Sequence, residues 1–244
     1  MKRWGLIGKD ISHSFSPTYF KKKFNDLQIK DTYELLDIEN LDNLRSTISQ
    51  MEWSGFNVTI PFKEKIIDLL DEVMPLAQKI GAVNAVKIID GKWIGTNTDA
   101  PGFEKSILPF LENHFPRALV IGTGGASKAV GFVLKDKGID TWFLSRNPQR
   151  NHHLGYHQVD VNSLKHFPLI IQTTPLGTFP NIEAKPNLPY DGLQPEHLLV
   201  DLIYNPIQTA FLREGEKRGC QTQNGLRMLE IQADLAWDFW NTTK

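Results

Sequence analysis

The sequence predicts an α/β fold in two lobes, each built on a mostly parallel sheet covered by helices. Short apolar runs alternate with helical patterns along the chain, and this alternation is typical of parallel sheets. A glycine-rich turn at 122–126 then opens a second series of the same kind. The length of 244 residues suits one large domain or two small ones.

The first series predicts strands and helices in alternation. We expect strands at 4–8, 33–38 and 56–60, helices at 17–29, 41–51 and 61–70, and a strand pair within 83–93. The pair should turn at Asp90-Gly91, because this dipeptide favours the positive φ angles of a tight hairpin. A helix at 100–113 is expected to connect the two lobes.

The second series repeats the order. We expect strands at 117–121, 141–144, 169–172 and 198–202, and helices at 126–137, 207–218 and 226–240. Residues 181–195 contain three prolines by sequence and predict a loop.

Composition excludes several classes of protein. The 27 basic and 28 acidic side chains leave a net charge of −1, which predicts neither nucleic-acid nor membrane-surface binding. No apolar run is long enough to span a membrane, and the run from Trp4 to Gly8 is too short for a signal peptide. The single cysteine, Cys220, fits a reducing cytoplasm. The oligomeric state stays open between monomer and homodimer, and no metal site is expected.

The glycine-rich turn predicts a dinucleotide site in a Rossmann-like lobe. It follows a strand and opens a helix, where backbone N–H groups can bind a pyrophosphate. Its residues are Gly122, Thr123, Gly124, Gly125 and Ala126. Ser127 stands where the standard motif has its third glycine, so a tight turn without a ligand is the alternative.

The end of the next strand favours NADP over NAD. An Asp or Glu there would hold the ribose 2′-hydroxyl of NAD, but the chain has Ser145 and Arg146, followed by Arg150. Asp140 precedes the strand and therefore lies at its other end. Guanidinium groups suit a 2′-phosphate, and two solvated surface arginines are the alternative.

Several polar residues are poorly explained by local structure. Asn57 and Thr59 share one face at the end of a strand, where open α/β sheets bind ligands. Lys63 follows Pro61 in the first turn of the expected helix, where a cation would face the positive end of the helix dipole. A half-exposed strand face and an ordinary surface lysine are the alternatives. Asp99 precedes an expected helix and, taken alone, is explained as its N-cap. Ser14 and Ser16 precede another helix start, where Ser16 is the natural N-cap. Gln232 differs, because it lies on an apolar helix stripe, where a buried amide needs a hydrogen-bond partner.

Taken together, the chain resembles the shikimate dehydrogenase family along nearly its whole length. The resemblance rests on eight motifs in family order. They are S-x-S-P at 14–17, N-V-T-x-P-x-K at 57–63, G-A-V-N at 81–84, N-T-D at 97–99, the glycine-rich turn, T-P-L-G at 174–177, D-x-x-Y-x-P-x-x-T at 201–209 and G-x-x-M-L-x-x-Q at 225–232.

The resemblance implies NADPH-dependent reduction of 3-dehydroshikimate to shikimate. It implies a catalytic pair of Lys63 and Asp99. It implies substrate contacts from Ser14, Ser16, Asn57, Thr59, Asn84, Tyr204 and Gln232. It extends the cofactor site to Thr174, Leu202 and Gly225. Residues 1–99 with 224–244 would form the substrate lobe and 100–223 the nucleotide lobe.

Some positions depart from the family pattern. Ser145 and Asn147 replace the asparagine and threonine of its cofactor motif, and Lys128 and Gln172 replace a common arginine and asparagine. A relative that also uses quinate, or that uses NAD, is therefore the alternative. A non-catalytic sensor with this fold should lack Lys63 or Asp99, and both are present.

Overall fold

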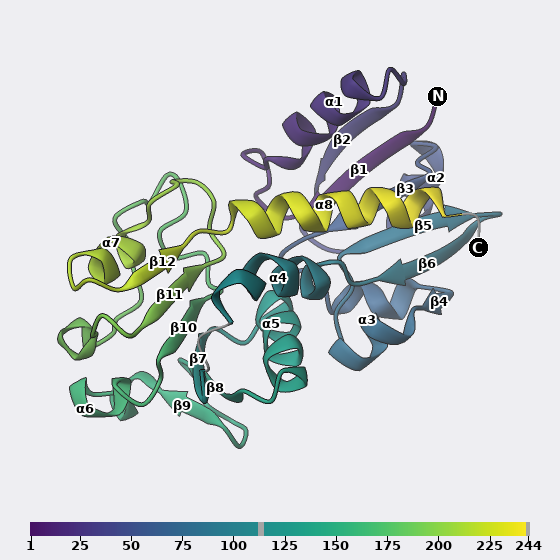
Figure 1. The fold of residues 1–244 in the computed structure, drawn as a ribbon. Coiled ribbons are helices and arrows are strands. Elements are labelled where there is room, and N and C mark those ends of the chain that lie inside the picture. The colour runs from purple at the N-terminus through teal and green to yellow at the C-terminus, as the bar shows by residue number, and fades with distance from the viewer. Residues whose placement is uncertain (112–114, 243–244) are drawn as a thin grey trace. The chain divides into compact units, whose positions relative to one another are not determined.

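The computed structural model describes residues 1–111 and 115–242. The chain divides into two compact units, which we treat separately. The first unit comprises Met1–Thr98 with Gln232–Lys244, and the second comprises Asp99–Ile231. The prediction of an α/β fold is confirmed, because each unit contains a six-stranded sheet (Figure 1).

The sheet of the first unit has the strand order β2-β1-β3-β5-β6-β4. Its strands are β1 (Arg3–Gly8), β2 (Thr32–Asp37), β3 (Gly55–Val58), β4 (Glu72–Val73), β5 (Ala85–Ile89) and β6 (Lys92–Thr96). Strand β5 runs antiparallel to β3 and β6, whereas the other pairs are parallel. The helices are α1 (Ser16–Asp26), α2 (Leu44–Gln50), the 3-10 helix η1 (Lys65–Leu69) and α3 (Pro75–Ile80). The predicted hairpin is confirmed, with φ angles of 50° at Asp90 and 77° at Gly91.

The helix expected at 61–70 is wrong. A turn occupies this segment before η1 begins at Lys65. The carbonyl of Lys63 accepts a hydrogen bond of 2.7 Å from Val83 N, so a distant segment uses an oxygen that an α-helix would need. The helix-dipole argument for Lys63 therefore does not apply.

The expected N-cap at Ser16 is also wrong. Phe15 takes the cap position of α1, with no side-chain cap hydrogen bond, and Ser16 is the first helical residue. The Ser16 side chain is available for other contacts as a result.

The second unit has an all-parallel sheet with the order β12-β11-β10-β7-β8-β9. Its strands are β7 (Arg117–Ile121), β8 (Asp140–Ser145), β9 (His153–Gly155), β10 (Leu169–Gln172), β11 (Leu198–Asp201) and β12 (Gln221–Gln223). Its helices are α4 (Asp99–Ile107), η2 (Leu108–Phe110), α5 (Gly125–Asp136), η3 (Tyr156–Gln158), α6 (Val161–Leu164), η4 (Tyr190–Gly192), α7 (Ala210–Glu216) and the start of α8 (Leu226–Asn241). The expected connector helix at 100–113 corresponds to α4 and η2, and residues 112–114 lie outside the described part.

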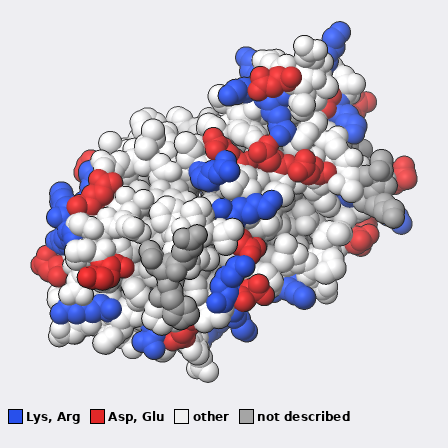
Figure 2. Space-filling model, in the orientation of Figure 1, with Lys and Arg blue, Asp and Glu red and all other residues white. Residues whose placement is uncertain are grey.

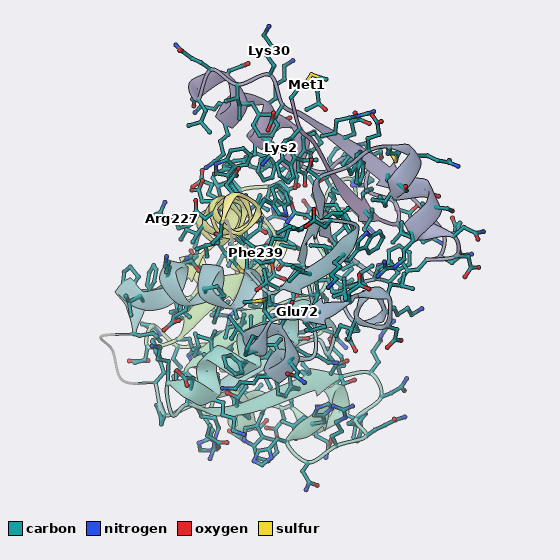
Figure 3. The ribbon with its side chains drawn as sticks, turned by 90° about the vertical axis from the view of Figure 1, so that its right-hand side faces the viewer. Met1, Lys2, Lys30, Glu72, Arg227 and Phe239 are labelled. Carbon is teal, nitrogen blue, oxygen red and sulfur yellow. The ribbon has the colours of Figure 1, made fainter. Side chains whose placement is uncertain are left out.

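Helix α8 lies over the sheet of the first unit (yellow in Figure 1), and its Trp240 and Trp237 side chains pack there in an aromatic cluster. Trp240 stacks on Trp4 with ring centroids 4.8 Å apart and donates a hydrogen bond of 3.0 Å from Nε1 to Val86 O. Burying such large side chains is a major stabilising contribution. In Figure 3 the labelled Lys2 and Lys30 lie at the amino ends of β1 and β2, so the carboxyl ends point the other way.

The surface has no large patch of one charge on the face shown in Figure 2, where basic and acidic side chains are interspersed. Among the described helices, none is long and apolar enough to cross a membrane. The mixed charges on that face give no reason to expect a polyanionic partner there.

Candidate active site

In the first unit, three strands meet at one edge of the sheet. The parallel strands β1 and β3 end there, at Gly8 and Val58, and the antiparallel β5 begins there beside Asn57. Thr59 N donates to Ile7 O at 2.9 Å, and Lys9 N donates to Ile60 O at 3.1 Å. This edge is where open α/β sheets usually bind ligands.

Buried amides line this edge and are linked to one another. Asn57 and Asn84 are 6% and 2% exposed. Asn57 Nδ2 donates to Asn84 O at 3.1 Å, and Asn84 Oδ1 accepts from Thr98 N at 2.6 Å. Asn84 Nδ2 donates to Thr98 Oγ1 at 2.9 Å and to Gln232 Oε1 at 3.3 Å. The structure thus brings three sequence-predicted site residues, Asn57, Asn84 and Gln232, into one network.

Hydroxyl groups lie in the two loops that follow β1 and β3. Ser14 Oγ accepts from Ser16 N at 3.3 Å, which leaves the Ser14 hydroxyl proton to be donated elsewhere. Thr59 packs closely on Gly8, where an added Cβ would lie 2.5 Å from Thr59 Cγ2. A larger residue than Gly8 would therefore displace Thr59.

The two expected catalytic residues belong to different units. Lys63 is half-buried in the turn after β3. Asp99 is only 4% exposed and is the first residue of α4. Their pairing therefore stays a prediction.

The glycine-rich turn of the second unit has the backbone that an anion site needs. Gly122 has a φ of 115°, which a side chain would disfavour, and an added Cβ would lie 2.7 Å from Thr173 Oγ1. An added Cβ at Gly124, by contrast, would meet nothing within 4 Å. Helix α5 then begins at Gly125, and the first N–H groups of a helix have no partner within it. The turn is therefore able to take a pyrophosphate.

Gln172 organises the loop that carries Thr174. It is fully buried, and its Oε1 accepts from Thr174 N at 3.0 Å and from Thr174 Oγ1 at 2.8 Å. Its Nε2 donates to Leu176 O at 2.9 Å. The sequence shows Gln172 only as a departure from the family pattern, because these three contacts depend on the folded loop.

The end of β8 has the arrangement that favours a phosphate. Arg146 and Arg150 are exposed just beyond Ser145, whose Oγ accepts from Asn147 N at 3.2 Å. Asp140 lies at the other end of β8, where it pairs with Arg117 at 2.9 Å. No carboxylate of the strand therefore competes for the ribose.

The segment after β11 is held by two close contacts. An added Cβ on Gly225 would lie 2.0 Å from Leu202 O, so only glycine allows this approach. Asp201 is fully buried, and burial raises its pKa to about 7 against the opposing hydrogen bonds from Thr209 and Ile203 N. These contacts fix the loop that carries Tyr204, which is partly exposed.

Comparison with known proteins identifies the family. Residues 6–86 match the model described as the shikimate dehydrogenase substrate binding domain. A shikimate dehydrogenase (NADP(+)) from Methanococcus maripaludis is 38% identical over 98% of this chain and 92% of its own length. The chain belongs to the shikimate dehydrogenase family. The resemblance inferred from the motifs is thereby confirmed.

Solved structures of shikimate dehydrogenases have the same fold. One from Peptoclostridium difficile superposes with a TM-score of 0.88 at 34% identity, over 100% of this chain and 93% of that one. One from Thermus thermophilus, in complex with NADP(H) and shikimate, has a TM-score of 0.86 at 34% identity, over 99% and 94%. The Rossmann-like character expected for the second unit fits these shikimate dehydrogenase folds.

Proposed function

We propose that this chain catalyses the reversible, NADPH-dependent reduction of 3-dehydroshikimate to shikimate, a step of chorismate and aromatic amino acid biosynthesis. The observation that carries the proposal is the network of buried amides at the carboxyl edge of the first sheet, in a chain of the shikimate dehydrogenase family. The Thermus relative binds both NADP(H) and shikimate. A small, hydroxyl-rich anion needs such amide and hydroxyl partners.

Seven residues are proposed to bind the substrate. Ser14 would donate its hydroxyl proton to the substrate carboxylate, and Ser16 would lie beside the same carboxylate. The amides and Thr59 would bind the ring hydroxyls, and Tyr204 would lie against the substrate. The complete set is Ser14, Ser16, Asn57, Thr59, Asn84, Tyr204 and Gln232.

Lys63 and Asp99 are the proposed catalytic pair. NADPH, when bound, would be the source of the hydride that reduces the substrate carbonyl. Lys63 Nζ would stabilise the negative charge that grows on the carbonyl oxygen and donate the proton to it, and it would accept that proton in the reverse direction. Asp99 would hydrogen-bond the substrate and hold the ammonium group of Lys63.

The cofactor residues fit NADP. Backbone N–H groups at 122–126 would bind the pyrophosphate. Arg146 and Arg150 would bind the 2′-phosphate, because each guanidinium can make paired hydrogen bonds to it. Ser145, Thr174, Leu202 and Gly225 would line the remainder of the site.

These assignments give the two parts of the chain separate roles. Residues 1–99 with 224–244 are proposed to bind substrate, and 100–223 to bind the cofactor. We further propose that the protein acts in the cytoplasm, as a monomer or homodimer. Its single cysteine, Cys220, is buried and not in a disulfide, which suits a reducing compartment.

The direct test is product identification. Purified protein should consume NADPH only when 3-dehydroshikimate is added, and should form one equivalent of shikimate for each NADPH, as measured by chromatography. The reverse reaction should form NADPH from shikimate and NADP. Failure to form shikimate under both conditions would contradict the proposal.

A further inference from the structure

Tyr33 lies beside the amide network of the first unit, yet it is not among the proposed substrate ligands. Its ring is held by aromatic neighbours. Phe20 stacks on it with ring centroids 4.4 Å apart and planes at 10°. The Trp240 ring is tilted against it, with ring centroids 6.4 Å apart. The position of the ring therefore does not depend on its hydroxyl group.

The Tyr33 hydroxyl group donates to Asn57 Oδ1 at 2.8 Å. The orientation of this amide is fixed from its other end, because Nδ2 donates to Asn84 O at 3.1 Å. A backbone carbonyl can only accept, so the nitrogen must face Asn84 and the oxygen must face Tyr33. The single proton of the phenol is thus committed to Asn57.

The Ser16 side chain lies within hydrogen-bonding reach of the same phenol. Since the Tyr33 proton goes to Asn57, the Ser16 hydroxyl must donate to the phenol oxygen. Burial also raises the pKa of Tyr33, which keeps the phenol protonated and preserves this direction. The Tyr33 hydroxyl group therefore determines which way the hydrogen bonds to Asn57 and to Ser16 run.

We propose that Tyr33 is a positioning residue of the substrate site, which holds the Asn57 amide so that its second N–H stays available to a substrate oxygen. The inference rests on the proposed function, because it takes Asn57 as a substrate ligand. Holding a ligand group in its binding orientation before the substrate arrives lowers the cost of binding. Loss of the phenol should therefore weaken substrate binding more than it slows the chemical step.

Tyr33→Phe is the appropriate variant, because it keeps the ring and removes one oxygen. Tyr19→Phe is a matched control. Tyr19 belongs to the same aromatic cluster, edge-on to Phe20 at 5.5 Å, but its hydroxyl group donates to Asp234 at 2.6 Å. We expect Tyr33→Phe to raise KM for 3-dehydroshikimate about fivefold to tenfold, the loss of one net hydrogen bond. KM for NADPH should not change, and Tyr19→Phe should have an effect of less than about twofold.

A double-mutant cycle with Asn57→Ala tests whether Tyr33 acts through Asn57. If it does, adding Tyr33→Phe to Asn57→Ala should change KM by less than about twofold. Effects that multiply in full, or an unchanged KM in Tyr33→Phe, would overturn the inference. A Tyr33→Phe protein without a cooperative thermal transition would also overturn it, because the phenol would then be needed for folding.

The wild-type protein separates this inference from the proposed function. A wild type that neither reduces 3-dehydroshikimate nor binds shikimate by calorimetry would refute both. An active wild type with an unaffected Tyr33→Phe variant would refute the role of Tyr33 alone.

Discussion

Thr209 Oγ1 donates a hydrogen bond of 2.6 Å to Asp201 Oδ2, and so closes the loop 202–209. Ile203 N donates to the other carboxyl oxygen at 3.0 Å. Tyr204 lies within this loop. The position of a proposed substrate residue is thus fixed by a buried carboxyl group that does not itself belong to the proposed site.

This carboxyl should make stability depend on pH. Burial raises the pKa of Asp201 from 3.8 to about 7, so between these values the folded protein holds a proton that the unfolded chain releases. The contribution of Asp201 to the free energy of unfolding is then largest below about pH 4 and is lost as pH rises through about 7. Asp201→Asn cannot titrate. Its Tm relative to the wild type should therefore increase from about pH 5 to about pH 8.

The control for this experiment is Asp238→Asn, which replaces an exposed carboxyl of α8. Its Tm difference from the wild type should stay constant over the same range. A constant difference for Asp201→Asn as well would mean that Asp201 titrates alike in the folded and unfolded states.

Lys63→Ala should reduce kcat by at least about 10²-fold, which is the low end for loss of a general acid. KM for 3-dehydroshikimate should change far less. Asp99→Asn should act similarly, and the double variant should lose less than the product of the two effects, because the pair works as a unit. Lys65→Ala is a matched control, since Lys65 is exposed at the start of η1. Normal turnover in Lys63→Ala would refute its assigned role.

Ser14→Ala should raise KM more than Ser16→Ala does. The Ser14 oxygen accepts from Ser16 N and its proton can go to the carboxylate, whereas the Ser16 hydroxyl is inferred to donate to Tyr33. Both variants should affect KM more than kcat, because these contacts exist before and during the reaction. Steady-state kinetics with 3-dehydroshikimate would measure the order. The reverse order would show that Ser16 turns toward the ligand when it binds.

Arg146→Ala should raise KM for NADPH about tenfold or more and leave KM for NADH nearly unchanged, because a hydrogen bond to a charged group contributes about 1.5–3 kcal/mol. Lys165→Ala removes an exposed cation of the second unit and serves as the charge control. Equal losses with both cofactors would indicate that Arg146 stacks on adenine without binding the 2′-phosphate.

Local signals in the sequence predicted elements whose causes are local. The strands at 117–121 and 169–172 have the predicted bounds, because buried parallel strands are continuous apolar runs. The helix expected at 61–70 failed because Val83 N takes the carbonyl of Lys63, a contact between residues far apart in sequence. Short elements such as β4, β9, β12, α3 and α6 were missed, since two to six residues carry little periodicity.

In the candidate site, too, local motifs were predicted and contacts between distant segments were not. The motifs named Asn57, Asn84 and Gln232, and the structure joins them in one network. Tyr33 was missed, because its sequence position is that of an ordinary strand aromatic. Only the fold brings its hydroxyl group to Asn57.

The central claim, that the chain is an NADP-dependent shikimate dehydrogenase, is tested most directly by the specificity constant kcat/KM for four pairs of substrate and cofactor. We predict that kcat/KM for 3-dehydroshikimate with NADPH exceeds that with NADH by about tenfold or more, given one arginine contact to the 2′-phosphate. In the oxidative direction, shikimate with NADP should be used far better than quinate with NAD. Equal efficiency with NADPH and NADH, or a preference for quinate with NAD, would contradict the account.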